Sequence, residues 1–190
     1  MVRKPLLSHH FFMYAYFVIM ERKVKMIITV PYDRIKAVEY ASRWAYLRNP
    51  EFYNFDSLGG DCTNFASQCL LAGSSVMNYP SWYYYSVNDR SPSWTGVEFL
   101  YDFLIKNKGL GPRGEYVGIN DARKGDLIQL DFDGDGRFSH TLVIVNVERK
   151  GNPAGILIAA HTNDSFNRPL DSYAFRKARF IHITNVGKDV

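Results

Sequence analysis

The chain has 190 residues, 46% of them hydrophobic and 22% charged, which is sufficient for one globular domain with a sizeable core. The formal net charge is +4, and Lys and Arg are scattered rather than gathered into a stripe, so we expect no nucleic-acid partner. Two cysteines provide neither a disulfide framework nor a four-ligand zinc spacing, so we expect no metal and no other cofactor.

Residues 1–30 are interpreted as an N-terminal extension, and residues 31–190 as a single domain. The extension carries ten consecutive apolar residues at 11–20, which is similar to the start of a signal peptide. Charged residues follow at 21–23 without a cleavage pattern, and ten residues are too few to span a bilayer. We therefore expect an upstream extension rather than an export signal and no stable membrane insertion. The compartment stays open between the cytoplasm and the cell envelope.

Helices are predicted in the first half of the domain. Apolar residues at helical spacing indicate an amphipathic helix over 32–48, which Asn49-Pro50 ends. A second helix is expected from Cys62 to about residue 71, directly after the turn-forming pair Gly59-Gly60. Thr95 and Glu98 fit a capping box at the start of a third helix that ends near residue 108.

An aromatic-rich segment separates the second and third helices. Residues 74–94 contain four Tyr and two Trp among Ser, Asn, Asp and Pro, which are typical of loops. We predict a structured loop that flanks a binding cleft, with Trp82 and Tyr84 as substrate-binding side chains. The alternative is that these rings fold back onto the core.

Short segments rich in β-branched residues dominate the second half. They cover 126–132, 140–147, 155–162 and 179–184, and together they predict an antiparallel meander. Helices followed by strands indicate an α+β fold in which N-terminal helices pack on a C-terminal antiparallel sheet. The acidic stretch 131–136 resembles the front of a calcium loop, but Leu142 stands where that loop needs Glu. We interpret it as a tight hairpin.

Cys62 is the candidate nucleophile. The positive end of a helix dipole favours an anion at the first turn, so we expect a lowered thiol pKa there. The alternative is that Cys62 is a small core residue. Cys69 lies in the middle of the same predicted helix, about 10 Å further along its axis, which is too far for a disulfide.

A cysteine nucleophile needs a base, and histidine is the usual one. Three of the five histidines are set aside, because His9 and His10 lie in the extension and His182 lies on the last strand. His140 begins one predicted strand and His161 ends the next. If these strands are neighbours, one imidazole can orient the other, and the result is a Cys–His–polar triad.

The segments GGDCTNFASQCLLAG, SWTGVEFLYDFL, KGDLIQLD, SHTLVIV and AAHTND occur in this order. With them, residues 32–184 resemble the Putative amidase domain of the papain-like cysteine hydrolases, which is related to the NlpC/P60 and CHAP cell-wall peptidases. The resemblance implies Cys62 as nucleophile, His140 as base, and His161 or Asn163 as the third, polar member. It further implies that Asp61 binds a substrate amine, whereas helix capping is the alternative role for this residue.

The resemblance implies hydrolysis of an amide C–N bond through a thioester, on peptide or peptidoglycan-like amides of a bacterial cell wall. The first alternative is a transferase that passes the acyl group of the same thioester to an amine, as in transglutaminases. The second is a non-catalytic module that retains the cleft. We expect the protein to be a monomer.

Overall fold

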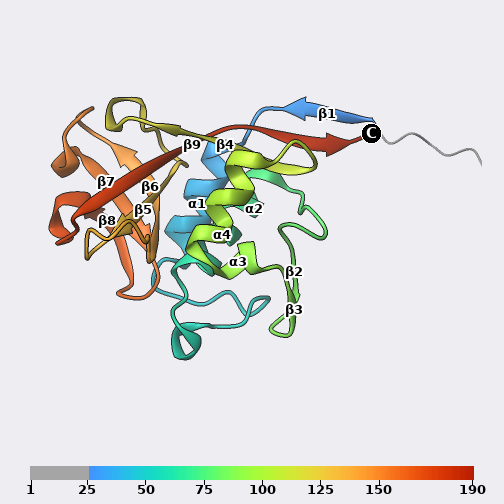
Figure 1. Ribbon diagram of the computed structural model, residues 1–190, viewed down its shortest axis with the longest axis horizontal. Coiled ribbons are helices and arrows are strands. Elements are labelled where there is room, and N and C mark those ends of the chain that lie inside the picture. Colours follow the sequence, from blue (N-terminus) through green and yellow to red (C-terminus); the bar gives the residue numbers. More distant parts are fainter. Residues whose placement is uncertain (1–25) are drawn as a thin grey trace, which may run out of the picture.

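The computed structural model describes residues 26–190, so the apolar run at 11–20 lies outside the described residues. The described part is an α+β fold in which helices cover one face of an antiparallel sheet (Figure 1). Within residues 26–190, no helix has the length and hydrophobicity required to cross a membrane.

Four α-helices form within the first half of the described chain. Their bounds are α1 Arg34–Trp44, α2 Cys62–Ser74, α3 Pro92–Thr95 and α4 Val97–Lys106. Short 3₁₀ turns lie at η1 Asp56–Leu58, η2 Ile119–Asp121, η3 Pro153–Gly155 and η4 Leu170–Ser172. The three longer helices confirm the helices predicted from the sequence, with ends shifted by a few residues.

Within residues 26–190, seven strands form the main sheet and two more form a hairpin. The bounds are β1 Ile27–Val30, β2 Tyr84–Ser86, β3 Asp89–Arg90, β4 Gly111–Val117, β5 Leu127–Asp131, β6 His140–Val147, β7 Ile156–Ala160, β8 Ser165–Pro169 and β9 Lys177–Asp189. The sheet order is β1-β9-β5-β6-β7-β8, and β4 pairs with β9. The predicted antiparallel meander is confirmed for β5, β6 and β7, but β8 continues it after β7, whereas the fourth predicted strand, β9, pairs with β5, β1 and β4 instead.

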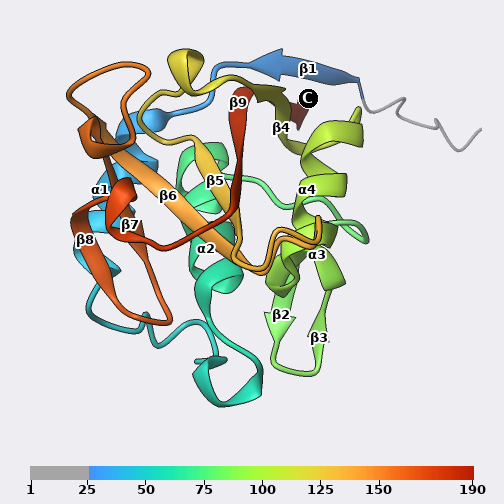
Figure 2. The ribbon, with the colours of Figure 1, turned by 60° about the vertical axis from the view of Figure 1, so that its left-hand side comes forward.

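Five strands were not predicted from the sequence. β4 contains two glycines and a proline, and β8 has the sequence Ser-Phe-Asn-Arg-Pro, so neither shows strong strand propensity. β1 belongs to the sheet although it falls inside the predicted extension, because it pairs with the end of β9. The β2–β3 hairpin lies in the segment expected to be a loop and projects beside α3 (Figure 2).

The predicted capping box at α4 is wrong. Gly96 occupies the N-cap position without a side-chain hydrogen bond, because Thr95 ends α3. The Glu98 carboxylate instead accepts hydrogen bonds from the Phe138 backbone N–H and from Arg179. It thereby ties α4 to the β5–β6 loop and to β9.

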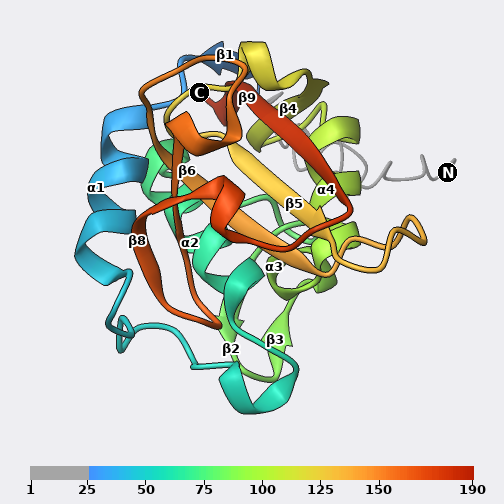
Figure 3. The same ribbon diagram turned by 90° about the vertical axis from the view of Figure 1, so that its left-hand side faces the viewer.

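The β5–β6 connection is a hairpin loop that extends from the sheet, as Figure 3 shows. The buried Asp131 carboxylate accepts hydrogen bonds from the backbone N–H groups of Asp133, Gly134 and Gly136. These contacts fold the loop tightly and bring the chain back to His140, which lies opposite Leu130 in the register of the two strands.

The sheet has a buried core on each face. On the helix-covered face, residues of α1, α2 and α4 pack against Leu127, Val143, Val145, Ala159 and Ile181. On the other face, Leu142, Ile144, Ile158 and Ala160 pack with Leu170 and Phe180. The alternation follows from the two-residue period of a strand, and it determines the face to which each candidate site residue belongs.

Candidate functional site

A turn of two glycines leads into α2. Gly59 and Gly60 have φ angles of 99° and 109°, which residues other than glycine rarely adopt. Cys62 is the first residue of α2, and Asp61 is its N-cap residue. The predicted position of Cys62 in the first turn of the helix is confirmed.

The Cys62 side chain is only 7% exposed and lies against the start of β6. Its sulfur is 3.7 Å from Thr63 Oγ1, which in turn is 3.0 Å from Thr141 Oγ1. Burial raises the pKa of the Cys62 thiol, although hydrogen bonding from the Thr141 backbone and from Thr63 lowers it in part. The expected lowering of the thiol pKa is therefore wrong, since desolvation outweighs the favourable helix position.

His140 is also buried, at 7% exposure, but its surroundings differ. Its ring packs near Phe132 and Tyr173, with centroid distances of 6.2 and 5.9 Å. Burial, together with the positive charge of Arg168, lowers the pKa of His140 to about 4, so the imidazole is neutral at pH 7. Its Nε2 atom is buried and has no hydrogen-bond partner within residues 26–190.

The Cys62 sulfur contacts the backbone of Thr141, the residue that follows His140, but Cys62 and His140 are not hydrogen bonded to each other. The sulfur of Cys62 contacts Thr141, which shares the helix-covered face with Val143 and Val145. Strand alternation assigns His140 to the other face, together with Leu142. Among the described residues, no hydrogen bond joins the sulfur to either ring nitrogen.

His161 lies directly after β7, on the helix-covered face. Its Nδ1 is 2.5 Å from Asp61 Oδ2, and its Nε2 is 2.9 Å from the carbonyl oxygen of Trp44. The ring stacks on Phe65 with a centroid distance of 4.0 Å. Both ring nitrogens are therefore occupied, and the expected hydrogen bond from His161 to His140 is not present.

Asp61 is fully buried and is held by several partners. Its Oδ1 accepts hydrogen bonds from the Phe55 backbone N–H and from Asn64 Nδ2, and its Oδ2 faces His161. It makes no capping hydrogen bond to the backbone of α2, so the capping alternative is wrong. The expected substrate amine would have to reach a carboxylate that is 0% exposed and already bonded on both oxygens. The structure thus provides Asp61 with a role in anchoring the turn before Cys62.

A pocket of about 340 Å³ lies beside His140 and is also lined by Thr162, Asn163, Arg168 and Tyr173. Thr162 joins this pocket to the start of α2, because its Oγ1 accepts a hydrogen bond of 2.9 Å from the Asp61 backbone N–H. Thr162 and Asn163 have φ angles of 60° and 73°, a strained backbone conformation that is concentrated at functional sites. Asn163, the alternative third member, therefore shares the pocket with His140 without a hydrogen bond to it.

The two aromatic residues expected to bind substrate belong largely to the core. Trp82 is fully buried, stacks on Phe103, and donates its indole N–H to Ser67 Oγ. Tyr84 is 8% exposed, and its hydroxyl accepts a hydrogen bond from the Tyr53 backbone N–H. The cleft prediction for Trp82 is wrong, because a large apolar ring gains more from burial than from exposure in a loop.

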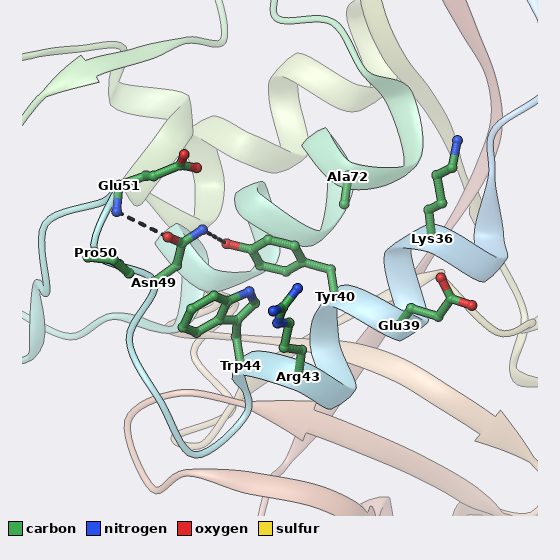
Figure 4. A pocket seen from close by; sticks show the side chains of 9 residues that line it. All are labelled: Lys36, Glu39, Tyr40, Arg43, Trp44, Asn49, Pro50, Glu51 and Ala72. Carbon is green, nitrogen blue, oxygen red and sulfur yellow. Dashed lines mark hydrogen bonds between the residues drawn. The ribbon is translucent and has the colours of Figure 1, made fainter.

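A separate pocket of about 550 Å³ lies between α1 and the loop after it (Figure 4). Tyr40 is one of its lining residues, and the Tyr40 hydroxyl donates a hydrogen bond to Gln68 and accepts one from Asn49. The charged residues around it are two cations and two carboxylates, so the pocket has no dominant charge. It shares no lining residue with the pocket beside His140.

Arg168 and Tyr173 were not among the site residues predicted from the sequence. Both lie in β8 and the segment after it, which carried no recognised strand signal. No local motif distinguishes them, since they acquire their position only when β8 pairs with β7 and η4 packs beside the sheet.

The chain belongs to the Putative amidase domain family, whose pattern matches residues 31–184. It is 38% identical over 139 residues to "Uncharacterized protein YhbB" of Bacillus subtilis (strain 168). That match covers 70% of this chain and 42% of the relative, so the chain spans less than half of the length of that relative. No solved structure matches the chain.

Proposed function

We propose that the protein is a thiol-dependent amide hydrolase in which Cys62 is the nucleophile and His140 the base. Membership of a family named for amidases supports the reaction class. The observation that carries the residue assignment is the packing of the Cys62 sulfur against Thr141, the residue next to His140, at the first turn of α2. His140 Nε2 has no other partner among the described residues and is therefore free to exchange a proton.

The raised thiol pKa and the lowered imidazole pKa favour a neutral resting pair rather than a thiolate–imidazolium ion pair. In this mechanism the imidazole takes the thiol proton as the sulfur attacks the amide carbonyl carbon. The C–N bond breaks, and His140 returns the proton to the departing amine. Water then attacks the thioester with His140 as base, the C–S bond breaks, and the proton returns to the sulfur.

The ring of His140 has to turn toward the sulfur for this step. We propose that the ring turns about its Cα–Cβ bond when substrate binds, because catalytic hydrogen bonds commonly tighten only in the substrate complex. The backbone N–H of Cys62 at the helix start is the proposed oxyanion donor, since it has no partner within the helix. We further propose a papain-like relationship and peptide or peptidoglycan-like amides as substrates, on the resemblance of the Cys62 and His140 segments.

The test compares wild-type protein with Cys62→Ala on a panel of peptide amides and muropeptides, with Cys69→Ala as the matched control. We expect Cys62→Ala to abolish release of the amine and Cys69→Ala to retain it, because Cys69 is a core residue at 1% exposure. Iodoacetamide should label Cys62 faster than Cys69. Unchanged turnover in Cys62→Ala would contradict the proposal.

A non-catalytic binding module is the second candidate, favoured by the lack of a hydrogen bond between Cys62 and His140. A crystal structure of the protein alkylated by a chloroacetamide peptide separates the two. An enzyme should show the His140 ring turned to the adduct, whereas a binding module should show no adduct or a ring still in its pocket. Product analysis with an added amine would distinguish acyl transfer from hydrolysis.

A further inference from the structure

The pocket beside His140 has one uncompensated positive charge. Among the described residues that line it, Arg168 is the single charged one, and none is Asp or Glu. Within residues 26–190, Arg168 makes no ion pair with a carboxylate. The guanidinium therefore presents its charge to the pocket without a counter-ion from the described protein.

The guanidinium is held in place by neighbouring groups. Its plane lies over the Tyr173 ring, with 3.9 Å between Cζ and the ring centroid. Arg168 Nε donates to Ser172 Oγ at 2.7 Å, and Nη2 donates to the Ser172 carbonyl oxygen at 3.1 Å. Arginine has five N–H groups, so three are left for a ligand, including both on Nη1. A guanidinium fixed in this way is preorganised for a planar anion.

Two further polar groups of the pocket residues have no partner. Tyr173 Oη and His140 Nε2 are both buried and make no hydrogen bond within the described chain. Unpartnered buried polar atoms are rare because each loses its hydrogen bonds to water without replacement. The two rings are neighbours, with their centroids 5.9 Å apart. A ligand that enters between Arg168 and His140 could supply a hydrogen-bonding group to each of the two unpartnered atoms, Tyr173 Oη and His140 Nε2.

We propose that this pocket is a substrate subsite that binds a carboxylate carried by the amide substrate, with Arg168 as the charged ligand and Tyr173 as a hydrogen-bond donor. The proposal rests on the proposed function, because it names the substrate class of that site. A pocket of about 340 Å³ accommodates a carboxylate together with one or two residues of a peptide. The lowered pKa of His140 agrees with this placement, since the charge of Arg168 reaches the imidazole.

Binding is tested in the Cys62→Ala variant, so the result does not depend on turnover. The probes are N-acetylglycylglycine and its C-terminal carboxamide, which differ in the carboxylate alone. The readout is the NMR signal of the His140 ring during titration with each peptide. We expect the acid to bind at least about tenfold more tightly than the amide, as charge-assisted hydrogen bonds to arginine require. Equal affinities, or no response to either peptide, would overturn the proposal.

Three further variants in the same background assign the ligands. Arg168→Gln should reduce the preference for the acid to less than about threefold, whereas Arg149→Gln, an exposed arginine outside the pocket, should retain it. Tyr173→Phe should weaken binding of the acid without lowering the melting temperature, because the lost hydroxyl has no partner in the free protein. A preference that persists in Arg168→Gln overturns the assignment. Failure of the proposed function alone would leave the binding preference intact while wild-type protein releases no amine.

Discussion

His140 begins β6 and His161 directly follows the neighbouring strand β7, yet the structure surrounds them in opposite ways. His161 has a partner for each ring nitrogen and stacks on Phe65 on the helix-covered face. His140 faces a pocket on the other side of the sheet, with an unpartnered Nε2. The difference separates a histidine whose two ring nitrogens are both bonded within the fold from one whose Nε2 has no partner among the described residues, although both side chains are almost fully buried.

The largest expected effect concerns His140. His140→Gln should lower kcat/KM for amide hydrolysis by about 10²- to 10⁴-fold, because the proposed general base is removed. The melting temperature should change little, since Nε2 makes no hydrogen bond in the described structure. Steady-state kinetics and thermal unfolding of the same preparation measure both quantities. If His140→Gln retained its activity, a residue other than His140 would have to act as the general base.

His161→Ala should mainly affect stability. We expect the free energy of unfolding to fall by roughly 2–4 kcal/mol, because the substitution removes a partner of the buried Asp61 carboxylate and opens a cavity beside Phe65. Urea denaturation measures the change, and His140→Ala is the matched control with a smaller expected loss. Equal losses in the two variants would remove the distinction between the histidines.

The pH dependence of stability follows from the lowered pKa of His140. Between pH 6.5 and about 4 the unfolded chain binds a proton at this position while the folded protein does not, so stability falls as the pH is lowered through this window. The difference of about 2.5 pKa units sets an upper limit of about 3 kcal/mol. Urea denaturation at both ends of the window gives the change in the free energy of unfolding for wild-type protein and for His140→Gln. The difference between the two changes is the contribution of His140, because the carboxylates titrate in both proteins. Parallel pH profiles would contradict it.

The smallest expected effect concerns Asn163. It shares the pocket with His140 but makes no hydrogen bond to it, so Asn163→Gly should lower kcat by less than about tenfold. Glycine is the appropriate substitution because φ is 73° at this position, and Ala would add backbone strain. A loss as large as that of His140→Gln would instead make Asn163 the orienting member of a triad.

Much of the architecture could be predicted from local patterns. The apolar period of α1 and the glycine pair before Cys62 predicted helices that the structure confirms. β6 begins and ends at the predicted residues because its β-branched run is bounded on both sides by polar and turn-forming residues. β4 and β8 could not be predicted this way, since their pairing partners rather than their own propensities make them strands.

Local sequence patterns were enough to identify residue types that could carry out the proposed chemistry, namely a cysteine after a glycine turn and histidines at the ends of two strands. Which of these side chains are already bonded depends on how the elements pack, because strand alternation and the packing of α2 direct His161 toward Asp61 and His140 away from it. Burial likewise decided the direction of the Cys62 pKa shift, since desolvation depends on neighbours that are distant in the chain. Arg168 and Tyr173 acquire their proposed role for the same reason.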